Sequence, residues 1–324
     1  MTRALAVAAV FFTTSLTAQQ AGAPNARTLR VGVERAAMIE SITQADLRAD
    51  LFFLAGDAMR GRLTDTNENR VTADYIRSRF ERAGLKPIAN GGYFHNYNLM
   101  SATLGEGNML ALSLGNDAAR AFKAGQDFYP QRFSGSGHVS TPVAFAGFGI
   151  TSSKINHDDY KGDVKGKIVL VLDHEPGERD PNSPFEGVVT AEAAAQWRKA
   201  LAAQQKGAAG ILFVSDVHNH PGPANFEQSG RNFWPATPRI PNYTLAAFAD
   251  RIHIPAAQIS TGVAASLIAG SGKTLEELGK QAEAAGGVSA LDLLNSRIEL
   301  RTAVDRRTVP DRNVLGLLEG SDPS

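Results

Sequence analysis

The fold class is indicated by residues 162–216, where two short apolar runs stand on either side of one helix. The runs are KGKIVLVL at 165–172 and GAAGILFVSD at 207–216. Both are aliphatic for five or six residues without alternation, which is typical of strands buried on both faces of a sheet. Thr190 is expected to cap the helix between them, and Gly207 to end it. A strand, a crossover helix and a second strand predict a right-handed parallel pair.

The same unit excludes one common kind of site. Its helix has an apolar stripe at Ala194, Trp197 and Leu201, which is expected to face the sheet. The first strand continues into a polar, proline-bearing loop as far as Val188, with no glycine-rich turn between strand and helix. A dinucleotide or phosphate site is therefore not predicted here.

Composition and charge exclude several other function classes. The chain has 324 residues, long enough for two domains, and 33 basic residues balance 33 acidic ones. A net charge of zero gives no electrostatic signature for nucleic acid or an acidic membrane. There is no cysteine, which excludes disulfides, thiol catalysis and thiolate metal sites. Any metal would need histidine and carboxylate ligands.

The amino terminus predicts export. Arg3 precedes an apolar run from Ala4 to Leu16, and small residues follow around Ala18 and Ala21. This layout is typical of a secretory signal peptide, and the run is too short to span a bilayer. No other segment approaches transmembrane length, so a secreted or periplasmic protein without a membrane span is expected.

The elements before the central unit are predicted from caps and periodicity. Thr43 begins a capping-box pattern, and the stripe of Leu47, Leu51 and Leu54 in the helix that follows is expected to pack on a core. A second helix is predicted over 68–83. Two strand-like segments come next and are interpreted as a meander; they cover residues 93–100 and 108–114.

The elements around and after the central unit follow the same logic. A strand is predicted to open the next domain at 143–150, and a loop of roughly two dozen residues runs from Asp216 to Tyr243. Helices are expected to start at Thr261 and Thr274. Strands are predicted over residues 252–259, 297–304 and 313–318.

The seven histidines offer three candidate metal-binding patterns, and none of them is complete. His218 and His220 form the tightest pair, but no carboxylate lies next to them, so they are interpreted as solvent-exposed loop residues. His157 and Asp159 have the His-x-Asp spacing found in two-zinc hydrolases. They occur in a polar turn before a strand, where an aspartate is more typically a cap.

The remaining candidates are also read as turns. His174 and Glu175 do follow a strand, but Pro176 and Gly177 come next and indicate a turn. The Gly-Ser-Gly segments at 135–137 and 270–272 lack the preceding buried strand that a nucleophile elbow requires. No catalytic, cofactor-binding or metal-binding residue is therefore assigned in this chain.

Several segments, taken in order, resemble the secreted zinc aminopeptidase family that includes aminopeptidase Y and glutamate carboxypeptidase. Residues 54–62 (LAGDAMRGR), 69–76, 80–87 and 92–94 look like the opening of that family's catalytic domain. Segments within 145–211, among them FAGFGI at 145–150 and 158–172, look like the protease-associated (PA) domain that many members carry as an insertion. Residues 313–323 look like the strand with which the catalytic domain resumes.

The resemblance implies an α/β fold in which a β-rich PA domain, containing the parallel strand-helix-strand unit, is inserted into the leading elements of a zinc-peptidase domain. The family's zinc ligands all lie beyond the strand matching 313–318, so none is carried over to this chain. The expected organisation is a signal peptide at 1–21, a flexible lead-in at 22–40, leading peptidase elements at 41–140, the PA domain at 141–270, and connecting helices and resumed strands at 271–324.

The expected function is that of the amino-terminal region of an exported metallo-aminopeptidase that acts on peptides from the free amino end. Two zinc ions are expected in the complete enzyme and none on this chain, whose partners would be peptide substrates and a missing carboxy-terminal catalytic segment. The alternative is a non-catalytic binding or receptor-like module of the same architecture. Neither reading involves nucleic acid.

Overall fold

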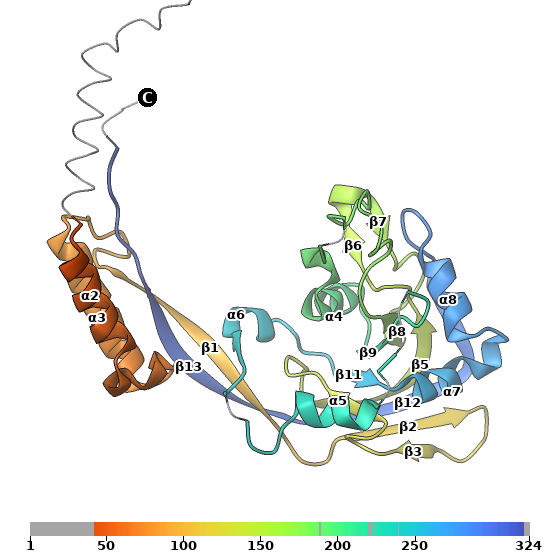
Figure 1. Ribbon diagram of the computed structural model, residues 1–324. Helices are drawn as coiled ribbons and strands as arrows, with labels where there is room; N and C mark the ends of the chain where they lie inside the picture. The colour runs from red at the N-terminus through yellow and green to blue at the C-terminus, as the bar shows by residue number, and fades with distance from the viewer. Residues whose placement is uncertain (1–41, 188, 220–221, 224, 239, 321–324) are drawn as a thin grey trace, which may run out of the picture. The chain divides into compact units, whose positions relative to one another are not determined.

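The computed structural model describes residues 42–187, 189–219, 222–223, 225–238 and 240–320 (Figure 1). The predicted signal peptide and lead-in, at 1–40, lie outside the described residues. The chain divides into two compact units. In the sequence, the first ends at Thr72 and the second begins at Ala73. No helix in the described part is long and apolar enough to cross a membrane.

The first unit consists of two helices and the start of a third: α2 (Gln44–Ala55), the 3-10 helix η1 (Asp57–Arg62) and the first turns of α3 (Asn67–Arg82). The Thr43 side chain accepts a hydrogen bond from the Asp46 backbone N–H, as the capping pattern predicts. The prediction that the α2 stripe packs on a core is wrong within this unit, because none of the α2 residues is buried.

The second unit is built around an eight-stranded mixed sheet, in the order β3-β2-β12-β5-β8-β9-β11-β4. Its middle strands β5, β8, β9 and β11 run parallel, and the flanking strands pair antiparallel. The strands are β2 (Met109–Leu114), β3 (Arg120–Phe122), β4 (Phe128–Pro130), β5 (Gly137–Phe145), β8 (Ile168–Leu172), β9 (Gly210–Val214), β11 (Ala256–Ile259) and β12 (Leu291–Thr302).

The central strands are buried on both faces, as predicted. Alternate β8 residues enter two separate hydrophobic clusters: Leu170 packs in one, and Val169 packs in the other. Helices α7 (Thr261–Ile268) and α8 (Leu275–Ala282) contribute to the first cluster, and α4 (Gln196–Gln205) to the second. The predicted parallel strand-helix-strand unit is therefore confirmed, and so is the α/β fold class.

The α4 helix starts five residues later than a cap at Thr190 predicts. A 3-10 turn, η3 (Glu192–Ala194), and the N-cap Ala195 precede it. A distant residue holds the segment before it, because the Ala191 N–H donates to the buried Glu175 carboxylate, sixteen residues earlier in the chain. The predicted end is right, since Gly207 has a φ of +84° that glycine adopts without strain.

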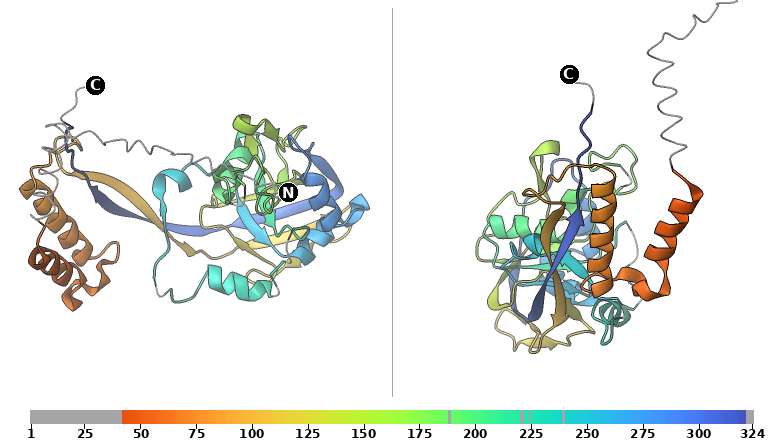
Figure 2. Two further views of the ribbon diagram at one scale, coloured as in Figure 1. Left: turned by 45° about the horizontal axis from the view of Figure 1, so that its top comes forward. Right: turned by 90° about the vertical axis from the view of Figure 1, so that its left-hand side faces the viewer.

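The predicted meander is wrong. Strand β1 (Phe94–Leu104) does not pair with β2. It forms an antiparallel ribbon with β13 (Val304–Val314) over eleven registered pairs, while β10 (Tyr243–Leu245) extends the other edge of β1. Figure 2 shows β1 and β13 side by side along their length. The predicted strand at 313–318 is only the end of β13 followed by a bridge from Leu317 to Lys86.

The segment expected to be a loop after Asp216 contains a helix, α5 (Phe226–Phe233), capped by the Asn225 side chain. Shorter elements complete the unit and are α6 (Ala246–Ala249), the 3-10 helices η2 (Ser153–Ile155) and η4 (Ala269–Ser271), and the hairpin of β6 (Thr151–Ser152) with β7 (His157–Asp158). The capping box predicted at Thr274 is confirmed, with Glu277 as its partner.

Trp197 on α4 supplies a first test of this packing. Its indole is half-buried and stacks on Phe248 of α6, with ring centroids 4.5 Å apart and an interplanar angle of 5°. We expect Trp197→Ala to lower the free energy of unfolding by about 2 kcal/mol, less than for a fully buried indole. Urea denaturation measures this loss. Trp197→Phe, which keeps a stacked ring, should cost less than half as much, and equal losses in the two variants would contradict the packing.

Candidate functional site

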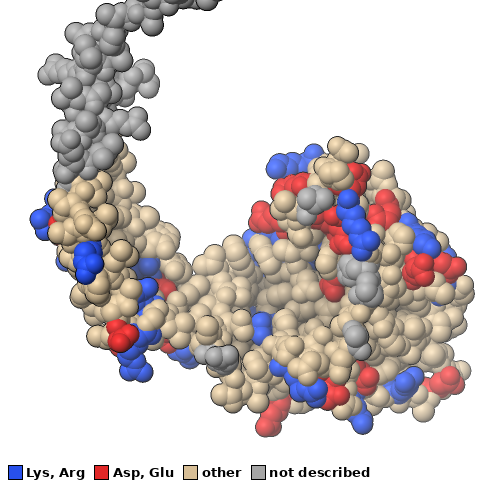
Figure 3. Space-filling model, viewed as in Figure 1, with Lys and Arg blue, Asp and Glu red and all other residues tan. Residues whose placement is uncertain are grey.

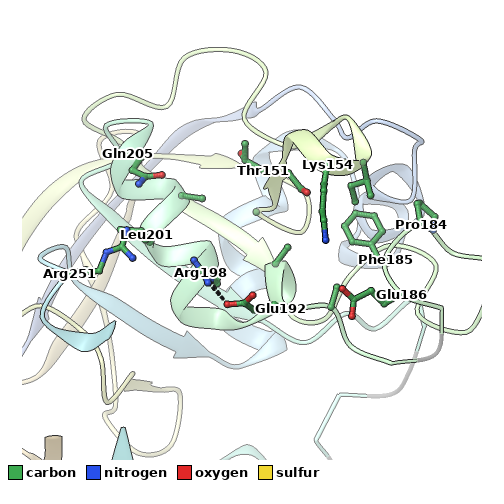
Figure 4. Close-up of a pocket in the computed structure, with 16 residues that line it drawn as sticks. Thr151, Lys154, Pro184, Phe185, Glu186, Glu192, Arg198, Leu201, Gln205 and Arg251 are labelled. Atoms are coloured by element: carbon green, nitrogen blue, oxygen red, sulfur yellow. Dashed lines mark hydrogen bonds and ion pairs between the residues drawn. The ribbon is translucent and has the colours of Figure 1, made fainter. Parts of the chain in front are cut away.

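The candidate site is a pocket of about 720 Å³ on the second unit, close to the carboxyl end of α4. Three segments far apart in the sequence bound it (Figure 4): the hairpin β6–β7 with η2, the loop at 184–193, and α4 together with Arg251. Its volume falls within the range of about 300–1,000 Å³ typical of ligand pockets. The side chains that fix these three segments decide its shape.

The hairpin is held by two neighbouring aspartates. The buried Asp159 carboxylate accepts hydrogen bonds from the backbone N–H groups of Ile150 (3.1 Å) and Val288 (3.2 Å). Asp158 accepts from the Thr151 hydroxyl and receives Lys206 Nζ at 2.8 Å. Because Lys206 follows α4 directly, this ion pair ties the hairpin to the helix. Asp158 also accepts the Tyr160 N–H at 3.0 Å and so caps its turn, as the sequence indicated, whereas Asp159 holds backbone groups outside its own turn.

The second wall is positioned by His157 and Glu175. The buried His157 ring packs edge-on against Phe185, at a centroid distance of 5.0 Å, and its Nε2 lies 3.0 Å from Asp159 Oδ1. Farther along this wall, Glu175 accepts the Ala191 N–H at 2.9 Å. Burial raises the pKa of the Glu175 carboxyl, while the Ala191 N–H and the nearby Lys199 oppose that rise.

The third wall carries Arg251 beside α4. Gln204 of α4 bridges to this loop twice: its amide donates to the Arg251 carbonyl (2.9 Å), and its oxygen accepts the His253 N–H (2.7 Å). The stack of Trp197 on Phe248 fastens the same loop from the other side. These contacts therefore fix the backbone of Arg251 next to the pocket, and none of them involves its guanidinium.

The charges around the pocket are unevenly compensated. The Arg198 guanidinium pairs with the Glu192 carboxylate, as the dashed line in Figure 4 marks. Among the described residues, neither Arg251 nor Lys154 has an ion pair or hydrogen bond from its side chain, and Glu186 lies on the same side of the pocket as Lys154. On the face shown in Figure 3, acidic and basic side chains of the second unit are interspersed.

Lys199, the residue after Arg198, points into the interior. Its side chain is fully buried and Nζ donates to the carbonyl oxygens of Leu172 (2.8 Å) and His174. Burial lowers the pKa of Lys199 to about 8, although surrounding carboxylates, chiefly Asp173 and Asp159, oppose the shift. This ammonium links α4 to the carboxyl end of β8.

Two acids follow the parallel strands β8 and β9, at the edge where α/β proteins often bind ligands. Both carboxylates accept hydrogen bonds from other groups of the protein. Asp173 accepts the side-chain amides of Gln196 (2.7 Å) and Gln258 (2.9 Å). Asp216 accepts the His218 N–H and the Asn219 amide.

The histidine patterns do not converge on a metal site. His174 adopts a φ of +63° in the predicted turn, and its Nδ1 lies 2.8 Å from Glu178. His218 is half-buried instead of exposed, and His220 lies outside the described residues. In the described part of the chain no three His, Asp or Glu residues are grouped so that they could hold a metal. The residues present therefore do not fit a zinc pair, and no step through zinc is assigned to them.

Sequence reasoning missed the pocket but named several residues that build it. His157, Asp159 and Glu175 were weighed as metal ligands, and the structure uses them to fix two walls. Arg251 and Gln204 carry no local motif. Only the adjacency of α4 and α6 brings them together, and a sequence pattern does not encode that adjacency.

Comparison with known proteins identifies the central part of the chain. The family model described as PA domain matches residues 137–267, which contain β5, β8, α4, β9, β11 and all residues that line the pocket. The chain thus carries a PA domain, and the resemblance inferred from its motifs is confirmed in this respect. No curated protein matches the sequence.

Three solved structures align with most of this chain. An aminopeptidase from Aneurinibacillus sp. strain AM-1 has 14% identity and a TM-score of 0.39, over 82% of this chain and 46% of its own. A peptidase M28 precursor from Shewanella amazonensis SB2B has 13% identity and a TM-score of 0.34, over 84% and 53%. A zinc aminopeptidase from Bacillus subtilis has 14% identity and a TM-score of 0.29, over 85% and 47%. The chain spans about half the length of these proteins.

Proposed function

We propose that the chain is the PA-domain-bearing amino-terminal part of an exported metallo-aminopeptidase that hydrolyses peptides from the free amino end. The observation that carries the proposal is the PA domain at 137–267. Support also comes from its flanks, since residues 54–94 and 313–323 resemble the segments that precede and follow this insertion in the zinc exopeptidases.

In this proposal the work is divided between two parts of a longer protein. The catalytic part would hold about two zinc ions and supply a metal-activated water and a general base. The PA domain would recognise peptide substrates or shape their access to the catalytic cleft. The eight-stranded sheet draws strands from both sides of residues 141–270, namely β2, β3 and β4 before them and β12 after them. The recognising part is therefore expected to need residues from about 109 to 302 in order to fold.

Metal content tests the proposal. The coding sequence should be expressed through the end of its reading frame, in parallel with residues 24–324 alone, and zinc measured by mass spectrometry after dialysis. We expect about two zinc ions per molecule in the longer protein and none in the shorter. If the reading frame continues but the longer protein holds no zinc, a non-catalytic module of the same architecture replaces this proposal.

Export is tested separately. The apolar run between Arg3 and Ala18 should direct secretion, followed by cleavage. Mass spectrometry of the secreted protein is expected to find an amino terminus between Gln19 and Pro24. An exported protein that still begins with Met1, or one retained in the cytoplasm, would contradict this expectation.

A further inference from the structure

We propose that the pocket between the β6–β7 hairpin, the 184–193 loop and α4 binds an extended peptide segment that carries a carboxylate, with Arg251 as its anchor. This inference rests on the proposed function, since it names the substrate chemistry that the PA domain reads. The carboxylate belongs to an acidic side chain of that segment.

Arg251 has the properties of an anchor. Its backbone is fixed by Gln204 and by the stack of Trp197 on Phe248, so little ordering is lost when a ligand binds. Its guanidinium has no partner among the described residues, and Figure 4 shows it directed toward the pocket beside Leu201 and Arg198. A planar guanidinium donates two parallel hydrogen bonds to a carboxylate, which gives geometric selectivity as well as attraction.

The other charges leave Arg251 as the uncompensated cation. Glu192 already neutralises Arg198 through an ion pair. At the opposite end of the pocket, Glu186 of the 184–193 loop lies on the same side as Lys154 of η2, so their opposite charges offset each other although no ion pair joins them, and Arg251 carries the remaining positive charge. The site therefore favours a ligand with one net negative charge placed near Arg251, and it offers no cluster of cations suited to a polyphosphate or a nucleic acid.

The remaining lining fits a peptide better than a small inorganic anion. Apolar side chains, chiefly Phe185, Ile155 and Leu201, give surfaces for alternate side chains of an extended segment. Gln205 has no side-chain partner among the described residues, so its amide can both donate to and accept from a peptide backbone. Figure 4 places Gln205 and Arg251 at one end of the pocket and Phe185 at the other.

The walls are built before any ligand arrives. Asp159 fixes the hairpin, Glu175 fixes the last part of the 184–193 wall at Ala191, and Gln204 fixes the Arg251 loop, each through hydrogen bonds to backbone groups. Pre-formed walls reduce the conformational entropy lost on binding, and this favours measurable affinity from a small contact area.

The test is direct binding of synthetic peptides to the purified chain, measured by fluorescence anisotropy at low and physiological salt. The probes are fluorescein-labelled Leu-Ala-Leu-Ala-Glu with an amidated end and the same peptide with Gln or Lys in place of Glu. We expect the Glu peptide to bind at least tenfold more tightly than the Gln peptide, and the Lys peptide to bind weakest. Arg251→Gln should abolish the preference for Glu over Gln.

Controls separate the anchor from general charge and from misfolding. Arg82→Gln removes an exposed cation of α3 that does not line the pocket, and it should leave the preference unchanged. Lys154→Gln should weaken the Glu peptide about twofold to threefold, because Glu186 offsets that cation. Circular dichroism should give the same melting temperature for wild type and Arg251→Gln, because Arg251 is exposed.

Two results would overturn the inference: retention of the Glu preference in Arg251→Gln, or no binding of any probe at millimolar peptide. Both can occur while the metal and activity tests of the proposed function succeed. Conversely, a carboxylate preference carried by Arg251 in a protein without zinc would reject the peptidase proposal and keep the binding site.

Discussion

We expect Asp159→Ala to lower the free energy of unfolding by about 3 kcal/mol, the largest loss of any single change considered. The Asp159 carboxylate is fully buried and accepts the N–H groups of Ile150 and Val288, while His157 Nε2 lies 3.0 Å away. Removing it leaves the buried Ile150 N–H and the half-buried Val288 N–H without an acceptor, and it takes away the carboxylate next to the His157 ring. Urea denaturation at neutral pH measures the loss.

Two comparisons make the Asp159 result specific. Asp305→Ala removes an exposed carboxylate on β13 and should change stability by less than about 0.5 kcal/mol. Asp159→Asn keeps the shape and one acceptor, so its loss should be intermediate. A loss below about 1 kcal/mol for Asp159→Ala would show that the hairpin is not held as described. We also expect Asp159→Ala to lower the affinity for the peptide, because the hairpin forms one wall of the pocket.

The second large effect is a rise in stability with pH that depends on Lys199. Burial lowers the pKa of Lys199 in the folded chain to about 8, from its ordinary 10.5. Between these values the unfolded chain binds more protons than the folded one, so the free energy of unfolding increases with pH. The contribution is complete above 10.5 and is lost as the pH falls through about 8. Its full size is roughly 3 kcal/mol.

The measurement compares urea denaturation of wild type and Lys199→Met at intervals from pH 7 to pH 10. The difference in unfolding free energy between the two proteins should grow in favour of wild type across that range. Burial also raises the pKa of Tyr160, which lowers stability above pH 10, but this effect is common to both proteins and cancels. Lys165→Met, at an exposed lysine, should keep the wild-type slope. Parallel curves for wild type and Lys199→Met would contradict a buried ammonium.

Local patterns predicted the centre of the fold because burial there leaves a direct mark on the sequence. Strands β8 and β9 are covered on both faces, so their side chains must be apolar in both directions. A polar residue within them would destabilise the sheet. The capping box at Thr274 and the glycine stop at Gly207 likewise depend on residues within a few positions. These features needed no knowledge of distant neighbours.

Strand partners were not predictable in the same way. The pattern of β1 indicates a strand but does not specify whether β2 or β13 lies beside it, because both offer similar alternation. The late start of α4 has a comparable cause, since the competing acceptor for the Ala191 N–H is Glu175, sixteen residues earlier. Helix α5 was missed because Gly230 and a polar composition resemble a loop.

The pocket could not be predicted from the sequence for a related reason. Its walls come from residues near 151–158, 184–193, 198–205 and 251, and only the tertiary fold makes them neighbours. The His-x-Asp spacing at 157–159 did mark an important position. The residue types alone, however, could not distinguish a metal ligand from a buried carboxylate that accepts backbone N–H groups. The PA domain was predicted from the family resemblance. The physical patterns alone predicted only an α/β unit in this part of the chain.

The most direct test of the central claim is aminopeptidase turnover. Leucine p-nitroanilide hydrolysis should be measured for residues 24–324 and for the protein expressed through the end of its reading frame, each with zinc and with a chelator. We predict turnover by the longer protein that the chelator abolishes and zinc restores, and none by residues 24–324. Zinc-dependent turnover by residues 24–324 alone would contradict the account, because the described residues gather no metal site.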